Sequence, residues 1–325
     1  MTRAPGLRRT FLATSLVLGA CSSETPSGPP LSDPRGLILL GTVAFPGELF
    51  AMRPDGSGLR QLTNDSINDA DGDWSPDGRS IVFTRSQDSV PGLSTNRPDI
   101  FTMNADGSGM RRLYEASGVA SGPRWSPDGR RIAFAQGCCL LGYFVHTSTR
   151  VHVMNADGGG VHVVTPQGGS FAPDWAPDGT RLLFLARRSE RPAQSMYTIR
   201  LDGTDERLVG GDVACVRDVH QATWSPDGSR IAYRCSDPPD YVIQVINADG
   251  TSPVRLSLVE SRLGFQMLDL SPVWSPDGAQ IAFGSTRASS TTSPWVMDAT
   301  GANVLPIGGV SLRGLIPVAW GPAPR

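Results

Sequence analysis

Short stretches in which apolar residues occupy every second position recur along the whole chain and predict β-strands. Ile81 and Phe83 show the pattern, and Ile281 and Phe283 repeat it far along the sequence. A period of two is typical of a strand with one buried face. No convincing helical segment separates these strands, so the pattern predicts an all-β protein.

A short turn motif precedes each of these strands. It reads Trp-Ser-Pro-Asp-Gly, with Ala for Ser in one copy, and begins at Trp74, Trp125, Trp175, Trp224 and Trp274. Pro presets φ for a tight turn, Asp suits the next position, and Gly accepts the positive φ that closes a hairpin loop. We interpret the motif as scaffold and not as a contact site, with Trp filling the space between neighbouring units.

The motif recurs at a nearly constant interval. Its tryptophans are separated by 51, 50, 49 and 50 residues, and Trp320 follows after a further 46. A period near 50 residues indicates an array or a β-propeller. In each unit, a third strand ends in a second turn such as Asn-Ala-Asp-Gly, and a short fourth strand follows. Each unit is therefore expected to be a four-stranded antiparallel sheet, or blade.

The two ends of the chain complete one blade together. The unit from Gly36 to Thr63 lacks a Trp-bearing first strand, and Pro317–Trp320 forms such a strand with nothing after it. Pairing them gives a closed ring of six blades and removes exposed sheet edges. The sequence thus predicts a six-bladed β-propeller over residues 36–325.

The first 35 residues read as an export signal and a tether. A basic start, the apolar run Phe11–Ala20 and Cys21 resemble a bacterial lipoprotein signal, with cleavage after residue 20 and acylation of Cys21. A plain secretory peptide is the alternative, and the Arg8-Arg9 pair leaves Sec and twin-arginine export open. Residues 21–35 form a Pro/Ser/Gly tether with an r.m.s. reach of ~20 Å. We expect a lipid-anchored protein of the cell envelope, at the outer membrane if the source is Gram-negative.

The net charge of the chain limits the classes of molecule that it can bind. The net charge is −2 with no lysine, and removal of the first 20 residues, which hold three of the 29 basic residues and no acid, leaves 26 − 31 = −5. An acidic domain does not favour nucleic acid or an anionic membrane surface. We expect an envelope protein or a small ligand as partner, and contact with the membrane through the lipid anchor only.

The repeated Trp-Ser-Pro-Asp-Gly and the following Asn-Ala-Asp-Gly resemble the TolB-like propeller family from about Gly36 to Trp320. The resemblance implies the fold. It leaves function open, because the family includes protein-interaction modules, propellers joined to prolyl-peptidase-type hydrolases and polysaccharide-degrading enzymes. Only a tether precedes Gly36, where TolB carries an α/β domain, so we expect a role outside the Tol–Pal machine.

Catalytic and metal-binding signals are weak. The chain has no Gly-x-Ser-x-Gly elbow and no His-x-x-x-His pair, and Gly309–Gly314 has the wrong spacing for a nucleophile elbow. His146 and His152 could approach one another, but exposed histidines are the simpler interpretation. Asp69–Asp73 looks calcium-like yet lacks the closing acid of an EF-hand loop, which favours a solvated acidic turn. We predict no catalytic residue, metal site or cofactor.

Four cysteines remain after Cys21. Cys215 precedes the Trp224 strand and Cys235 ends the strand after it, so both are expected at one rim of the fifth blade and are the candidate disulfide. Cys138 and Cys139 lie in the corresponding loop of the third blade. Three pairings and free thiols all stay open.

The loop of residues 136–150 is unusually apolar. Leu140, Leu141, Tyr143 and Phe144 either cap one face of the propeller or form a contact for a partner.

Two functions of the whole protein are compatible with these observations. The first is a membrane-tethered, non-catalytic binding module that uses the loop-rich face or the central channel. The alternative is an envelope enzyme that acts on a glycan or peptide at the channel mouth. Inward-facing His and acids would favour the second.

Overall fold

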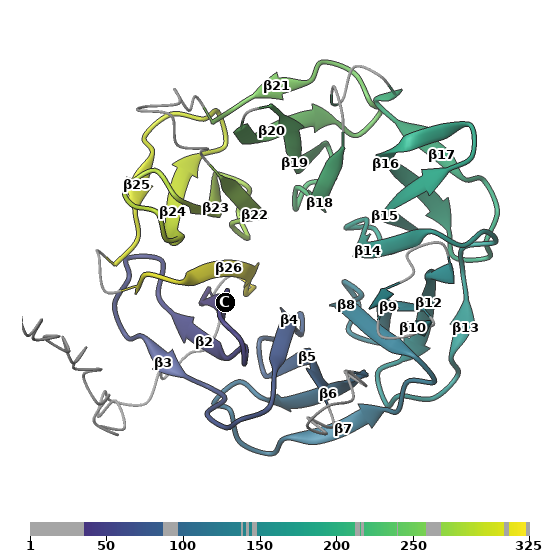
Figure 1. The fold of residues 1–325 in the computed structure, drawn as a ribbon, viewed down its shortest axis with the longest axis horizontal. Helices are drawn as coiled ribbons and strands as arrows, with labels where there is room; N and C mark the ends of the chain where they lie inside the picture. Colours follow the sequence, from purple (N-terminus) through teal and green to yellow (C-terminus); the bar gives the residue numbers. More distant parts are fainter. Residues whose placement is uncertain are drawn as a thin grey trace, which may run out of the picture.

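The computed structural model describes residues 36–86, 97–137, 139–140, 143–144, 148–211, 215, 218–238, 240–257, 268–308 and 312–322. These residues form a ring of six four-stranded antiparallel sheets around a central axis (Figure 1). Within each sheet, the four strands lie side by side, from an innermost strand next to the axis to an outermost strand at the rim. The predicted all-β, six-bladed propeller is confirmed, and no helix in the described part is long and apolar enough to cross a bilayer.

The blades are numbered along the ring, and their strands are given from the axis outward. Blade 1 contains β26 (Leu315–Trp320), β1 (Ile38–Thr42), β2 (Leu49–Met52) and β3 (Arg60–Gln61). Blade 2 contains β4 (Asp69–Trp74), β5 (Ser80–Ser86), β6 (Pro98–Asn104) and β7 (Arg111–Tyr114). Blade 3 contains β8 (Val119–Trp125), β9 (Arg131–Gly137), β12 (Arg150–Asn155) and β13 (His162–Val163).

The other three blades follow the same plan. Blade 4 contains β14 (Ser170–Trp175), β15 (Arg181–Arg188), β16 (Arg191–Arg200) and β17 (Arg207–Val209). Blade 5 contains β18 (Val219–Trp224), β19 (Arg230–Asp237), β20 (Asp240–Asn247) and β21 (Val254–Arg255). Blade 6 contains β22 (Asp269–Trp274), β23 (Gln280–Ser285), β24 (Ser293–Asp298) and β25 (Leu305–Pro306). A separate pair, β10 (Cys139–Leu140) and β11 (Tyr143–Phe144), follows β9.

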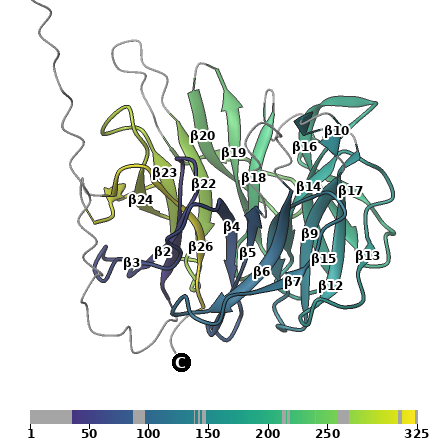
Figure 2. The same ribbon diagram turned by 60° about the horizontal axis from the view of Figure 1, so that its bottom comes forward.

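Blade 1 closes the ring as predicted. β26 pairs antiparallel with β1, so that Trp320 lies opposite Ile38 and Leu315 lies opposite Thr42. The C-terminal strand thereby occupies the innermost place of the blade that the N-terminal strands begin. Figure 2 shows β26 at this junction, next to β22 of blade 6.

The Trp-Ser-Pro-Asp-Gly segments are tight turns between the first and second strands of blades 2–6, and we call them the first turns. In blade 2, Ser75 Oγ donates to Asp77 Oδ1 at 2.6 Å, and the Arg79 N–H donates to the same oxygen at 3.0 Å. Gly78 has a φ of 70°, which an L side chain adopts only with strain. All first turns lie on one face of the ring, the turn face. The opposite face, where β1 ends, is the loop face.

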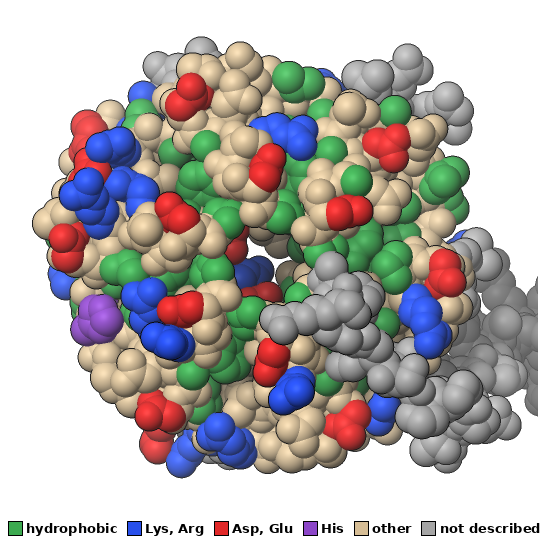
Figure 3. Space-filling model, turned by 180° about the vertical axis from the view of Figure 1, so that it is seen from behind, with side chains coloured by type: hydrophobic (Ala, Val, Ile, Leu, Met, Phe, Trp, Pro, Cys, Tyr) green, Lys and Arg blue, Asp and Glu red, His purple; other side chains and the backbone are tan. Residues whose placement is uncertain are grey.

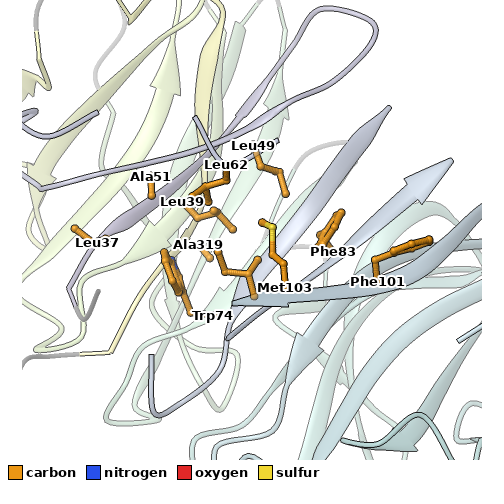
Figure 4. Packing of buried hydrophobic residues seen from close by; sticks show 11 residues of the cluster. Leu37, Leu39, Leu49, Ala51, Leu62, Trp74, Phe83, Phe101, Met103 and Ala319 are labelled. Carbon is orange, nitrogen blue, oxygen red and sulfur yellow. The ribbon is translucent and has the colours of Figure 1, made fainter. Parts of the chain in front are cut away.

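The core lies between the blades. Trp74, Ile81 and Phe83 of blade 2 pack against Leu39 and Ala319 of blade 1 in one cluster (Figure 4). The residue between Ile81 and Phe83, Val82, is equally buried but packs toward blade 3. The prediction of one buried face is therefore wrong for the second strands, because each blade is sandwiched between two others.

The Asp69–Asp73 segment is also different from its prediction. It is not a solvated acidic turn but β4, the innermost strand of blade 2. Asp69 is buried at the loop face and forms an ion pair with Arg85, whose Nη1 lies 2.9 Å from Asp69 Oδ2. Arg85 also pairs with Asp65. In the described part of the chain, no three His, Cys, Asp or Glu side chains are arranged to hold a metal ion.

Candidate functional site

A cavity of about 650 Å³ lies on the axis of the ring and opens at the turn face. All six blades contribute to its wall through their innermost strands and the residues that follow them. Figure 3 shows the hollow at the centre of the ring, bordered by hydrophobic side chains, with acidic and basic side chains inside it. The tryptophans of the repeat line it: Trp74, Trp125, Trp175, Trp224, Trp274 and Trp320. Six prolines form its rim: Pro76, Pro127, Pro177, Pro226, Pro276 and Pro322.

The repeat motif therefore has two roles. Its turn builds the scaffold, and its Trp and Pro side chains form the wall and mouth of the channel. Trp175 Nε1 donates to the Arg124 carbonyl at 3.0 Å, and Trp274 Nε1 donates to the Thr223 carbonyl at 3.3 Å. These two bonds join Trp175 and Trp274 to the innermost strand of the preceding blade, so at these two boundaries the channel wall also ties neighbouring blades together.

A backbone irregularity repeats on the innermost strands. The residue three positions before the tryptophan has a positive φ in blades 2–6: Asp71, Gly122, Ala172, Gln221 and Ser271. At the same point the pairing with the second strand shifts register, as between Ala70 and Asp73. This is a β-bulge. Side chains of a regular strand point to the two faces of the sheet in alternation, and the bulge interrupts that alternation. The bulge brings residues at adjacent positions to the channel.

One sector of the channel wall is polar and carries charge. Asp71, Asp73, Arg124 and Asp174 come from blades 2, 3 and 4, and Gln221 follows on blade 5. Asp73 Oδ2 accepts a hydrogen bond of 2.8 Å from the Trp125 N–H. Asp174 Oδ2 accepts one of the same length from the Trp224 N–H. These carboxylates satisfy backbone donors on the exposed edge of the next blade's first strand.

The opposite sector is apolar. Val273 of blade 6 and Val318 and Ala319 of blade 1 line the cavity there. Between the described residues of β22, β26 and β4, no side chain–backbone hydrogen bond of the kind seen around Asp73 joins neighbouring blades. One wall of the channel can thus contact polar or charged groups of a ligand, and the opposite wall can contact a hydrophobic group.

The electrostatics of the polar sector follow from its depth. Burial raises the pKa of Asp73 from 3.8 to about 6, and the nearby Arg124 guanidinium opposes this rise. Burial also raises the pKa of Asp174, against the hydrogen bond from the Trp224 N–H and the charge of Arg124. Asp71 is exposed and accepts a hydrogen bond of 3.2 Å from the Gly122 N–H. Three acids and one arginine give this sector a net negative charge.

The histidines take no part in this site. Among the residues that line the channel cavity there is no histidine. His152 lies on β12, where its Nδ1 is 3.0 Å from the Arg150 carbonyl and its ring stacks on Phe134. His146 lies outside the described residues, so its predicted approach to His152 stays a hypothesis.

The other predicted site residues are not part of the channel. Cys21 and the tether lie outside the described residues. Residues 139–140 and 143–144 form the β10–β11 pair, but Leu141 and the side chains of Leu140, Tyr143 and Phe144 lie outside the described part. The structure joins Cys215 and Cys235 in a disulfide, and Cys235 lies opposite Val219 near the loop face of blade 5.

The sequence analysis named the repeat tryptophans that line the channel but missed its charged residues. The only available signal was the place of Asp73, Arg124 and Asp174, each directly before a repeat tryptophan. An alternating pattern turns one side of a strand toward the axis, and the bulge at Asp71 and Ala172 breaks that alternation. Gly122 hints at a positive φ, whereas Ala172 and Gln221 do not.

A six-bladed propeller with a Trp- and Pro-lined axial channel defines the class of this protein. Comparison with family models identifies the particular family. The TolB beta propeller domain model matches residues 27–203 and 90–265, and the chain belongs to this family.

Individual relatives are distant. An uncharacterized protein of Agrobacterium fabrum is 26% identical over 205 residues, which cover 59% of this chain and 63% of that protein. The Tol-Pal system protein TolB of Francisella tularensis subsp. holarctica is 26% identical over 248 residues, or 75% of this chain and 51% of that protein. The chain thus spans between about half and two thirds of the length of these two relatives.

Solved structures show the same fold. TolB from Acinetobacter baumannii superimposes with a TM-score of 0.68 at 19% identity, covering 88% of this chain and 66% of that one. A putative TolB from Agrobacterium tumefaciens gives a TM-score of 0.64 at 19% identity, covering 84% and 88%. At these identities the likeness concerns the fold alone.

Proposed function

We propose that the protein is a non-catalytic binding module of the cell envelope, lipid-anchored through Cys21, that holds a protein segment or small ligand in the axial channel. The observation that carries this proposal is the cavity of about 650 Å³ at the turn face, with its opposed polar and apolar walls. A concave, largely pre-formed site with a few convergent polar groups is the usual form of a binding site. The net negative polar sector favours a partner group that is cationic or rich in hydrogen-bond donors.

Similarity supports an envelope role for this module. Relatives of the chain include Tol-Pal system proteins, and the N-terminal sequence reads as a lipoprotein signal. Acylation of Cys21 would hold the domain at the membrane through the 21–35 tether.

The alternative is an envelope enzyme with its active site at the channel mouth. Raised pKa values at Asp73 and Asp174 are a feature that catalytic acids share. However, each carboxylate already accepts a backbone N–H from the next blade. The lining also holds the hydroxyls of Ser121 and Ser271, but none of the lining residues is a histidine that could activate them, so the geometry supports binding better than acid–base catalysis.

A paired charge reversal tests the binding site. Asp71→Arg places a cation in the polar sector at an exposed position, and Glu115→Arg makes the same change outside the channel, where the side chain is 72% exposed. The proposal expects a partner recovered with the lipoprotein from its own envelope to be lost with Asp71→Arg and retained with Glu115→Arg. Equal recovery with both variants would contradict channel binding.

A further inference from the structure

An apolar tip projects from blade 1 on the loop face. It consists of Val43, Ala44, Phe45 and Pro46, which join β1 to β2, and all four residues are exposed. Phe45 is 72% exposed and Val43 is 54% exposed. Among the residues that the structure describes, the other exposed large hydrophobic side chains lie singly on the outermost strands β13, β17, β21 and β25. The Val43–Pro46 tip differs from these single residues because its four exposed apolar residues are consecutive.

The tip is held in place by hydrogen bonds at its base. The Thr42 N–H donates to the Glu48 carbonyl at 3.0 Å, and the Glu48 N–H donates to Thr42 Oγ1 at 2.9 Å. The Val43 N–H donates to the Gly314 carbonyl at 2.9 Å, which fastens the tip to the segment before β26.

A second attachment lies at Gly47. Its N–H donates to Asn68 Oδ1 at 2.7 Å, and its carbonyl accepts from the Asp69 N–H at 2.9 Å. A Cβ at this position would lie 2.6 Å from the Asp69 carbonyl oxygen, so the close approach requires glycine. These bonds present the apolar side chains to solvent in a fixed arrangement instead of letting them fold back.

The surroundings of the tip argue against a protein interface. A stable protein–protein contact buries about 800 Å² on each partner, with an apolar centre much wider than four residues. The flanking segments expose Asn64, Asp65 and Ser66 on one side and Arg313 on the other. Glu48 is bonded inward, to Thr63 Oγ1 and the Asp65 N–H, and Asp65 pairs with Arg85. A small rigid apolar tip beside an exposed arginine suits a lipid surface, where Phe enters the interface and Arg meets phosphate.

We propose that the Val43–Pro46 tip inserts into the bilayer that carries the lipid anchor, as a membrane contact additional to the anchor that the sequence predicts as the only one. This inference rests on the proposed acylation of Cys21. The residues between Cys21 and Gly36 span at most ~50 Å when extended, and the seven residues from Gly36 to Val43 span about 23 Å, so the tether is long enough. With the loop face on the membrane, the channel mouth on the turn face points away from it and is open to a partner.

Depth-dependent quenching tests the inserted tip. Phe45→Trp adds one indole at the tip, and Val163→Trp adds one at an exposed position on the outermost strand β13 as the matched control. Each full-length lipoprotein is reconstituted in vesicles of phosphatidylethanolamine and phosphatidylglycerol, with and without brominated acyl chains. The emission that each variant adds to that of the unaltered protein is then compared.

The inference predicts that the brominated lipids quench the added Phe45→Trp emission by about twofold and leave the Val163→Trp emission unchanged. Equal quenching of the two variants, or protection of the new indole by a second copy of the chain, would overturn the tip's membrane contact while the anchor stands. Failure of the protein to float with the vesicles would overturn the anchor and the tip together.

Discussion

The side chain of Asp73 reaches across the boundary between two blades to the backbone of Trp125. Its Oδ2 accepts a hydrogen bond of 2.8 Å from the Trp125 N–H, 52 residues further along the chain. Asp174 makes the same contact with Trp224 across the boundary between blades 4 and 5. The wall of the channel is thus also the seam of the ring, and its charge affects both binding and stability.

This contact makes stability depend on pH in a defined direction. Burial raises the pKa of Asp73 to about 6, from 3.8 in its ordinary state. As pH rises from 4 to 6, the unfolded chain loses this proton first, so this carboxyl destabilises the fold progressively and is fully costly above pH 6. Asp73→Asn keeps an acceptor for the Trp125 N–H without a charge. We expect it to raise the free energy of unfolding by on the order of 2 kcal/mol at pH 7 and to leave it unchanged near pH 4.

Asp71→Asn is the control, because Asp71 lies on the same strand but is exposed. Denaturant unfolding from pH 4 to 7 should give parallel curves for this variant and the unaltered protein. A constant difference between Asp73→Asn and the unaltered protein across this range would show that the Asp73 carboxylate carries no such cost.

The buried ion pair at the loop face is a second test. Asp69 and Arg85 are both buried and lie 2.9 Å apart. Burial raises the pKa of Asp69 to about 7, although the charge of Arg85 opposes this rise, and Arg85 keeps Asp65 as a second partner. Asp69→Asn therefore leaves no unpaired charge, and we expect it to cost about 1–3 kcal/mol, as for a buried polar group left with a poorer partner. Arg112 and Glu115 form an exposed pair at 3.1 Å, so Glu115→Gln should change the free energy of unfolding by less than about 0.5 kcal/mol. If both variants lose less than about 0.5 kcal/mol in the free energy of unfolding, the Asp69–Arg85 pair does not contribute to stability as we expect.

Removal of β26 tests closure. A chain ending at Gly314 lacks the strand that pairs with β1 from Ile38 to Thr42, together with the buried Leu315 and Ala319. Two sheet edges are then left open. We expect the whole domain to lose its cooperative thermal transition or to melt more than about 10 °C lower. A transition within about two degrees of that of the intact protein would be incompatible with a ring closed at this blade.

The Cys215–Cys235 pairing is open to direct mapping. The bond closes a loop across a sequence separation of 20, which in the chain-entropy model contributes ~3 kcal/mol to stability. Non-reducing digestion of the exported protein should yield a peptide that links these two cysteines, and Cys235→Ser should lower the free energy of unfolding. A linked peptide containing Cys138 or Cys139 together with Cys215 or Cys235 would replace this assignment.

Much of the fold was predictable because the sequence repeats it. The Pro-Asp-Gly turns set the ends of the first and second strands, and the orphan strand at Trp320 indicated how blade 1 closes. The burial of Val82 was not predictable from alternation. A strand between two packed blades is buried on both faces and reads as a continuous apolar run, as Ile81-Val82-Phe83 does.

The candidate site was harder to predict than the fold. Asp69, Asp71 and Asp73 follow one another at alternate positions and read as a solvated turn. In the structure Asp69 is in an ion pair, Asp71 is exposed in the channel, and Asp73 bonds the next blade. The bulge at Asp71 and the neighbouring blades decide these three environments, and neither is visible in the local sequence.

Photo-cross-linking at the channel mouth tests the central claim most directly. A photoreactive phenylalanine derivative replaces Pro226, which is exposed at the rim of the cavity, or Val254, which is 53% exposed on the outermost strand of the same blade. Irradiation of cells that carry either protein should give an adduct of one defined mass from position 226 and none from position 254. Adducts from position 254 alone, or from neither position, would contradict a binding site in the axial channel.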